Sequence, residues 1–154
     1  MIPDPTKLLK AAGINTPLIG FYDVPDPSPF KPLVKARGCF FSAYPKWMKG
    51  ESTCISKTDT FCRGGQYWVC GTAWASKEEF ANSLNRREGF KSTDHIMEQW
   101  IDNVKPYQIQ NGYVVIGLLN EAQYSYLKTV TFFVNPDQLS LLMLGAEYNN
   151  TSLS

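Results

Sequence analysis

One uninterrupted apolar run limits the fold of this chain more than any other feature. It extends from Tyr113 to Leu119 and contains no charged residue. Residues of this kind, rich in valine and isoleucine, favour strands, and a strand that is apolar on both faces has to be covered on both faces. The run therefore predicts a strand in the middle of a sheet, with other elements packed above and below it.

Shorter segments predict the neighbours of this strand. Runs of β-branched and aromatic residues predict strands at Leu18–Tyr22, Thr53–Ile55 and Thr129–Val134. Helix-capping patterns stand at Ser76–Glu79, at Ser92 or Thr93, and at Asn135–Gln138. Because strands alternate with helices, we expect a mixed α/β (α+β) fold, in which helices pack on a central mixed sheet.

The remaining segments carry proline and glycine signals. Proline-rich residues 25–32 predict an extended loop, and residues 38–50 predict a buried helix that Pro45 shortens or kinks. Residues 60–71 predict a glycine-bearing turn followed by an apolar segment, whose pattern fits helix and strand equally. A first short helix is expected to stop at Gly13.

Length and composition set the class of protein. With 154 residues, 44% hydrophobic and 14% aromatic content, the chain suits one globular domain over residues 1–154. A net charge of +1 gives no large electrostatic footprint for nucleic acid. The first residues lack the apolar core of a signal peptide, and no apolar run is long enough for a membrane helix. We therefore expect a cytoplasmic protein with no membrane partner.

All four cysteines lie within one stretch of the chain, at Cys39, Cys54, Cys62 and Cys70. No two of them form the C-x-x-C pair that is typical of a structural zinc site. An iron–sulfur cluster tolerates looser spacing, so a cluster or another metal held by Cys39 and Cys62 stays open. A reducing compartment disfavours disulfides, and free cysteines are frequently core residues, which is the simplest interpretation of this group.

Cys62 is the strongest candidate for thiol chemistry. It stands directly before Arg63-Gly64-Gly65, so a neighbouring cation and free glycine amides would favour its thiolate. The same amides could bind an anion without the sulfur, or the glycines could only form a tight turn. His95, the one histidine, lies near a predicted helix start and is the candidate base for a Cys–His pair. A lone histidine on a polar helix face is, however, more often a surface residue.

A second candidate region follows the central strand. Asn120 and Glu121 come directly after Leu119. Ligands bind at the carboxyl ends of strands in open parallel sheets, so these two residues would line a site if their strand were parallel to its neighbours. Four aromatic residues could contribute to an apolar pocket or to the core: Tyr22, Trp47, Trp68 and Trp74.

Several segments together carry a family resemblance. They are Leu119-Asn120-Glu121-Ala122, Val130–Asn135 and Pro136–Leu139, with Cys39 and Ala43 at the spacing C-x-x-x-A and with Cys62-Arg63-Gly64-Gly65. From Pro17 to Tyr148 the chain resembles the uncharacterised ArCR family, domain of unknown function 169. The resemblance implies no established activity, but it singles out Cys39 and Cys62 among the cysteines. It also implies that members continue further, so that residues 1–154 would be a short member or the N-terminal part of a longer domain.

These observations lead to three hypotheses and leave open whether the protein is an enzyme. The first is a module that binds a small ligand or cofactor, with a pocket formed by Cys39, Cys62, Gly64, Gly65, Asn120 and Glu121. The second is a thiol-dependent redox protein or enzyme that acts through Cys62, alone or with an iron–sulfur or other metal centre. The third is an interaction domain completed by another chain, which includes a homo-oligomer.

Overall fold

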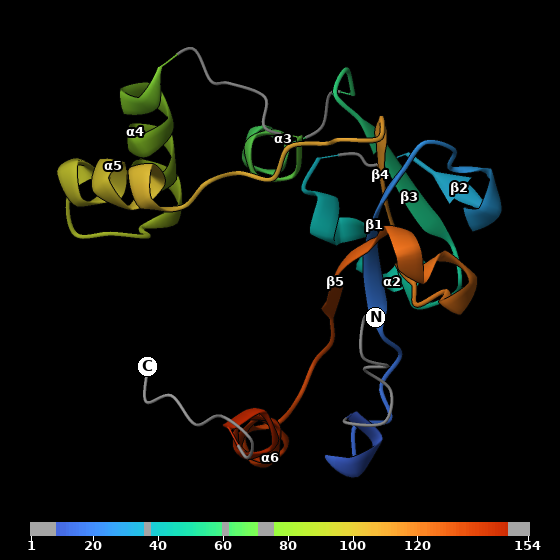
Figure 1. Cartoon of the computed structure of the whole chain (residues 1–154). Helices are drawn as coiled ribbons and strands as arrows, with labels where there is room; N and C mark the ends of the chain where they lie inside the picture. The colour runs from blue at the N-terminus through green and yellow to red at the C-terminus, as the bar shows by residue number, and fades with distance from the viewer. Residues whose placement is uncertain (1–8, 36–37, 60–61, 71–75, 148–154) are drawn as a thin grey trace.

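The computed structural model describes residues 9–35, 38–59, 62–70 and 76–147. Its centre is one sheet of five strands in the order β2-β3-β4-β1-β5 (Figure 1). The strands are β1 (Ile19–Val24), β2 (Leu33–Val34), β3 (Ser52–Ser56), β4 (Tyr113–Leu118) and β5 (Leu127–Thr131). β2 is parallel to β3 and the other pairs are antiparallel, so the expected mixed sheet is confirmed, with β4 in its middle.

Helices connect and flank these strands. The longer ones are α3 (Arg63–Cys70), α4 (Lys77–Glu88), α5 (Asp94–Asn103) and α6 (Pro136–Glu147). The shorter ones are η1 (Ser28–Phe30), η2 (Phe40–Ala43), α2 (Tyr44–Trp47) and η3 (Glu121–Tyr126), and residues 9–11 form a further helical turn. None of the described helices has both the length and the apolar character needed to cross a bilayer.

The predicted caps are present at the starts of α4, α5 and α6. Ser76 Oγ accepts a hydrogen bond from Glu79 N at 3.0 Å, and Thr93, rather than Ser92, caps α5. Asn135 and Gln138 bond each other's backbone amides at 2.9 and 3.1 Å. Each of these bonds satisfies an amide that has no partner within its own helix, which is why the helices start where the sequence predicts.

The two faces of the sheet carry separate cores. The core of the first face comprises Ile19, Ile55, Val114 and Ile116, with Trp47 of α2 and Val69 of α3. The core of the second face comprises Tyr22, Val24 and Val115, with Phe30 of η1. Side chains alternate between the faces along each strand. β4 is therefore covered on both sides, as its apolar sequence predicts.

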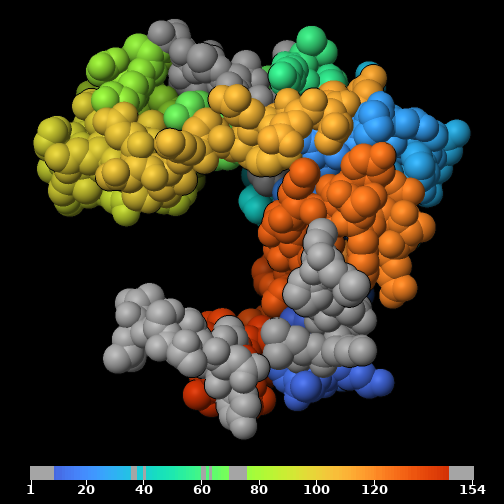
Figure 2. All heavy atoms as spheres, in the orientation of Figure 1, coloured from blue at the N-terminus to red at the C-terminus, as the bar shows by residue number. Residues whose placement is uncertain are grey.

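α4 and α5 form a helical lobe beside the sheet (Figures 1 and 2). The two helices pack on each other through Phe80, Ala81, Met97 and Ile101. Tyr67 and Trp68 of α3 pack against the same cluster, so α3 connects the helical lobe to the sheet.

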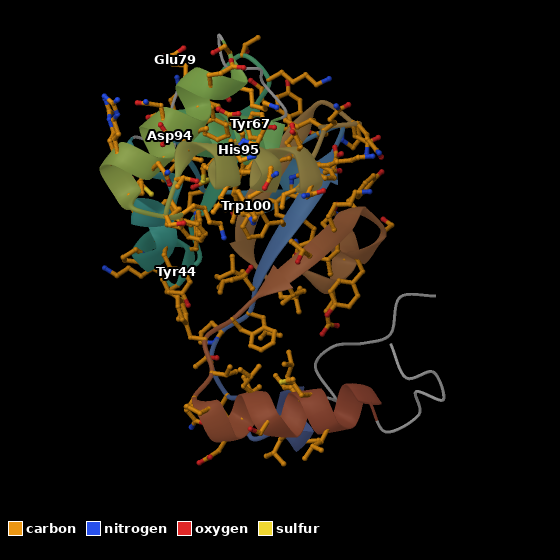
Figure 3. The ribbon with its side chains drawn as sticks, turned by 90° about the vertical axis from the view of Figure 1, so that its left-hand side faces the viewer. Tyr44, Tyr67, Glu79, Asp94, His95 and Trp100 are labelled. Atoms are coloured by element: carbon orange, nitrogen blue, oxygen red, sulfur yellow. The ribbon has the colours of Figure 1, made fainter. Side chains whose placement is uncertain are left out.

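Residues 9–18 and 132–147 form a terminal arm at the other end of the molecule (Figures 1 and 2). Leu9, Ala12 and Ile14 make its core, against which Leu142 of α6 packs. Tyr44 of α2, labelled in Figure 3, meets Phe133 of the terminal arm edge to face, with ring centroids 5.0 Å apart. This ring contact links the terminal arm to the elements that cover the first face of the sheet.

The structure corrects the predicted limits of several segments. The strand expected at Thr129–Val134 is Leu127–Thr131, because the following residues leave the sheet and pack in the terminal arm. Residues 25–32 contain the helical turn η1, and residues 38–50 divide into η2 and α2 near Pro45. Within residues 60–71, the described part is the helix α3, and its glycines belong to that helix.

Candidate functional site

A cavity of about 420 Å³ lies against the first face of the sheet, next to α3. Its walls are mostly apolar and include Phe21 of β1, Val114 of β4, Trp68 and Val69 of α3, and Tyr107. We call it the sheet cavity. Phe21, Trp68 and Tyr107 are each only partly buried. Three aromatic rings from separate parts of the chain therefore contribute to one hollow.

Trp68 is fixed by other aromatic rings. Its ring centroid lies 4.7 Å from that of Tyr67, 5.2 Å from that of Trp100 and 6.0 Å from that of Phe80. Figure 3 labels Tyr67 and Trp100 on their helices. Edge-to-face contacts of this kind add to the stabilisation from burial. The helical lobe therefore holds one wall of the sheet cavity in place.

Asp23 is the charged residue of β1 and is fully buried. Its carboxylate accepts hydrogen bonds from Gln110 N at 2.8 Å, from Asn111 N at 2.8 Å and from the Tyr107 hydroxyl. Asn111 Nδ2 also donates to the Asp23 carbonyl oxygen at 3.1 Å. These bonds tie residues 107–111 to the end of β1, and they position Tyr107 as a wall of the sheet cavity.

The same bonds set the ionisation of Asp23 and Tyr107. Burial alone would raise the pKa of Asp23, but its three donors and the charge of Lys128 outweigh burial and lower the pKa. Burial and the hydrogen bond to Asp23 raise the pKa of Tyr107, which stays a protonated donor. Each group is engaged with the other, so the pair is suited to holding the wall of a binding site rather than to moving a proton.

A β-bulge brings a lysine to the sheet cavity. Phe21 pairs with Thr129 and Tyr22 pairs with Leu127, so Lys128 is an extra residue in β5. Consecutive side chains of a regular strand point to opposite faces, yet Lys128 and Thr129 both line the cavity. The bulge explains this placement. Lys128 is exposed, and among the described residues it forms no ion pair.

Asn120 and Glu121 line a different cavity, of about 450 Å³, next to η1. β4 is antiparallel to both of its neighbours, so the condition for a site at the carboxyl ends of parallel strands is not met. Asn120 also has structural roles. Its amide donates to Tyr22 Oη at 2.7 Å, and its side chain accepts from Ala122 N at 3.1 Å and caps η3.

The three described cysteines with defined side chains lie in three environments. Cys39 is exposed, Cys62 packs against the core of the first face, and Cys54 packs against that of the second. Burial, with a smaller effect from Asp59, raises the pKa of Cys54 to about 11, so this thiol stays protonated at neutral pH. The side chain of Cys70 is outside the described part of the structure. Within that part, no three His, Cys, Asp or Glu side chains are arranged to hold a metal ion.

Cys62 has a structural role as the cap of α3. Its Sγ accepts a hydrogen bond from Gly65 N at 3.2 Å, and its carbonyl oxygen accepts one from Gln66 N at 2.9 Å. Gly64 and Gly65 form the first turn of the helix, so the predicted tight glycine turn is wrong. The Gly65 amide is bonded to Cys62 Sγ, and anion binding by the amides of Gly64 and Gly65 stays a prediction. Thiol chemistry at Cys62 stays a prediction.

His95 lies on α5, in the helical lobe (Figure 3). It is exposed, and its Nε2 lies 3.2 Å from Gln99 Nε2. No contact in the described part of the chain joins it to Cys62, which packs against the sheet. The cavity that Asn120 and Glu121 line likewise includes no residue of the Cys62 segment. The candidates predicted from the sequence therefore do not converge on that cavity.

The residues of the sheet cavity that were not predicted from the sequence include Asp23, Tyr107 and Lys128. A charge inside the apolar run Ile-Gly-Phe-Tyr-Asp-Val is a signal for a buried, paired carboxylate, and it could have identified Asp23. No local signal marks the bulge, because strand register sets it. Of the four aromatic candidates, Trp68 and Tyr22 line the cavity, although Tyr22 also belongs to the core of the second face. Trp47 belongs to the core of the first face, and Trp74 is outside the described residues.

These features define a mixed α+β protein with a largely apolar cavity against one face of its sheet. The chain belongs to the uncharacterised ArCR family, domain of unknown function 169, whose pattern matches residues 7–153. The resemblance found in the sequence is thereby confirmed. No curated protein and no solved structure matches the chain. Membership of this family does not assign an activity to the chain.

We predict that Asp23→Asn lowers the free energy of unfolding by about 2–3 kcal/mol at pH 7, because an amide cannot accept from all three donors. Tyr107→Phe should cost less, about 1–2 kcal/mol, since it removes one donor only. The pKa of Asp23 is lowered in the folded state. Its stabilising effect is therefore complete above the unfolded value of about 3.9 and is lost as pH falls through the folded value.

Urea unfolding of both variants at pH 7 and at pH 3 checks this prediction. The difference in the free energy of unfolding between wild type and Asp23→Asn should be smaller at pH 3 than at pH 7. Asp137→Asn is the control, because Asp137 is exposed on α6 and should change stability by no more than about 0.5 kcal/mol. A gap that stayed constant down to pH 3 would contradict the assigned role of the Asp23 charge.

A second prediction separates capping by Cys62 from thiol chemistry. Serine also accepts a hydrogen bond from a helix amide, so Cys62→Ser should be more stable than Cys62→Ala by about 1 kcal/mol. At Cys54 the order of stability should reverse, so that Cys54→Ala is more stable than Cys54→Ser. Cys54 packs among apolar residues, and a serine hydroxyl would be costly to bury there. Urea denaturation of the four variants measures both orders. The same order at both positions would be inconsistent with a cap at Cys62.

Proposed function

We propose that this protein binds a small, largely apolar molecule in the sheet cavity. The observation that carries the proposal is a cavity of about 420 Å³ with walls of Phe21, Trp68, Val69, Tyr107 and Val114. Ligand sites are mostly apolar clefts of roughly 300–1,000 Å³ with a few polar groups that orient the ligand. Lys128 and Thr129 are the polar groups of that kind at this cavity.

The walls are held in position by contacts that do not depend on a ligand. Rings from the helical lobe hold Trp68, and the buried carboxylate of Asp23 holds Tyr107. A site that is ordered in advance loses little conformational entropy on binding. This supports binding at the C-terminal half of α3. The earlier candidates at Cys39, Cys62, Gly64 and Gly65 lie toward the other end of that helix.

We predict that 2-naphthamide, a flat neutral probe, binds at a single site with a Kd on the order of 1 mM, as expected for a ligand of its size. Thr129→Trp should weaken this binding at least tenfold, because the indole ring would occupy the cavity. Thr131→Trp is the matched control, since Thr131 lies on the same strand but does not line the cavity. Ligand-observed NMR titration measures the three affinities.

Two results would overturn the proposal. One is the absence of saturable binding to the wild-type protein at millimolar probe. The other is equal binding by the Thr129→Trp variant, provided that circular dichroism shows the variant to be folded. Loss of binding in both tryptophan variants would also count against the sheet cavity, because it would indicate a general effect of β5 rather than occupation of the site.

The apolar surface of α6 favours a second function, self-association. Leu139, Leu141, Met143 and Leu144 are 49–68% exposed, although a helix that is apolar nearly all round is normally buried. Together with Phe133 they present on the order of 500 Å² per chain, so two copies would bury about 1,000 Å², near the lower limit of specific interfaces. The charged residues of α6, Asp137 and Glu147, stand at its two ends. An apolar middle of this kind can pair with its own copy about a two-fold axis.

We predict that the wild-type protein is a dimer in multi-angle light scattering at tens of micromolar, and that Leu141→Gln with Leu144→Gln makes it a monomer. Phe90→Gln is the control, because it removes an apolar side chain that is 58% exposed but lies beside the helical lobe. The control should remain a dimer. A wild-type protein that stays monomeric across this range would exclude the second copy as the partner of α6.

A further inference from the structure

We propose that the ligand of the sheet cavity is a small aromatic carboxylate, whose anionic group is held by Lys128 and Thr129. The inference rests on the proposed binding function and names its ligand class. It starts from one juxtaposition: a lysine lines a mostly apolar cavity, whose other lining residues are aromatic or apolar apart from Thr129 and the hydrogen-bonded Asp23. Such a cavity is complementary to a molecule with an apolar ring at one end and a negative charge at the other.

A β-bulge in the pairing of β1 with β5 determines where Lys128 lies. Without the bulge between Phe21 and Tyr22, Lys128 and Thr129 would point to opposite faces of the sheet. With it, both residues line the same cavity. Bulges occur next to binding sites because they redirect a side chain. Here the redirected group is a cation, and a threonine hydroxyl beside it can donate a second hydrogen bond to the same anion.

A structural explanation for Lys128 also exists. β5 is an edge strand, and lysines and bulges both protect edge strands from pairing with other chains. Protection of an edge only requires a charge in solvent, however. It does not account for a lysine that lines an aromatic cavity together with its neighbour Thr129. Edge protection predicts that replacing Lys128 has no specific effect on ligand binding, whereas a role in the site predicts weaker binding of anions. Binding measurements can therefore distinguish the two explanations.

Asp23 does not cancel the charge of Lys128. Its carboxylate is fully buried and receives its hydrogen bonds from Tyr107, Gln110 and Asn111. No ion pair between Asp23 and Lys128 forms in the described structure, although the lysine is close enough to contribute to the lowered pKa of the carboxyl. The ammonium thus keeps hydrogen-bonding capacity for a ligand.

The walls favour a ring as the apolar part of the ligand. Phe21, Trp68 and Tyr107 each keep part of the ring exposed. Aromatic rings attract one another in stacked and edge-to-face arrangements beyond the effect of buried area. A flat ring between α3 and the strands would meet all three, whereas a flexible chain would lose more conformational entropy on entering.

The test compares three probes that differ in charge on the same ring: 2-naphthoate, 2-naphthamide and 2-naphthylmethylammonium. Isothermal titration calorimetry or NMR titration at low salt measures each affinity for the full chain. The wild-type protein should bind the carboxylate about two- to fivefold tighter than the amide and the ammonium most weakly, since an exposed ion pair contributes a factor of this size. Lys128→Gln should reduce carboxylate binding to the level of the amide and leave amide binding unchanged.

Two further variants complete the test. Lys128→Glu should reverse the order, so that the ammonium probe binds more tightly than the carboxylate, a change that loss of edge protection would not produce. Lys57→Gln, which removes an exposed lysine from the turn after β3, should change no affinity. The ligand class is overturned if Lys128→Gln leaves carboxylate binding unaltered or weakens all three probes equally. In the first of these cases, amide binding to the wild type still supports the proposed function. Failure of every probe to bind would remove both proposals.

Discussion

The buried carboxylate of Asp23 is the interaction on which the candidate site depends. A charge taken out of water is costly unless it is paired or fully hydrogen-bonded. β1 can therefore be buried at Asp23 only when Tyr107, Gln110 and Asn111 are in place to donate to it. Folding of the sheet and closure of residues 107–111 are coupled in this way. Tyr107 both donates a hydrogen bond to Asp23 and lines the sheet cavity. The hydrogen bonding of the Asp23 carboxylate therefore positions one wall of the cavity.

The two faces of the sheet differ in how completely they are filled. On the second face the Tyr22 ring lies over Gly20, where even a methyl group would collide with it, and its hydroxyl accepts from Asn120 N. That face is closed near β1. On the first face Phe21 and Thr129 stand where α3 and residues 107–111 leave space between them. The asymmetry follows from the covering elements. The turn η1 packs on the second face through Phe30, whereas the short helix α3 divides its contacts between the first face and the helical lobe.

Features that depend on local sequence were predicted, and features that depend on distant partners were not. The burial of β4 follows from an apolar run, and the starts of α4, α5 and α6 follow from capping side chains that bond within a few residues. The antiparallel direction of β4 has no local signal, and it removed the argument for a site at Asn120 and Glu121. The sequence predicts a glycine turn after Cys62 because glycine usually breaks helices, whereas packing of Val69 and Trp68 on both sides stabilises α3 as a helix.

The kind of selectivity that this cavity can exert follows from its chemistry. Lys128 is exposed, so water competes with any anion it binds, and the charge alone can separate a carboxylate from a neutral molecule by only a small factor. The walls are fixed and mostly apolar, and a mismatch of one methylene group in such a pocket changes affinity by roughly 10–200-fold. Shape would therefore contribute more to selectivity than charge does. The charge would instead set the orientation of the ligand, because Lys128 is the one cation among the described residues that line the cavity.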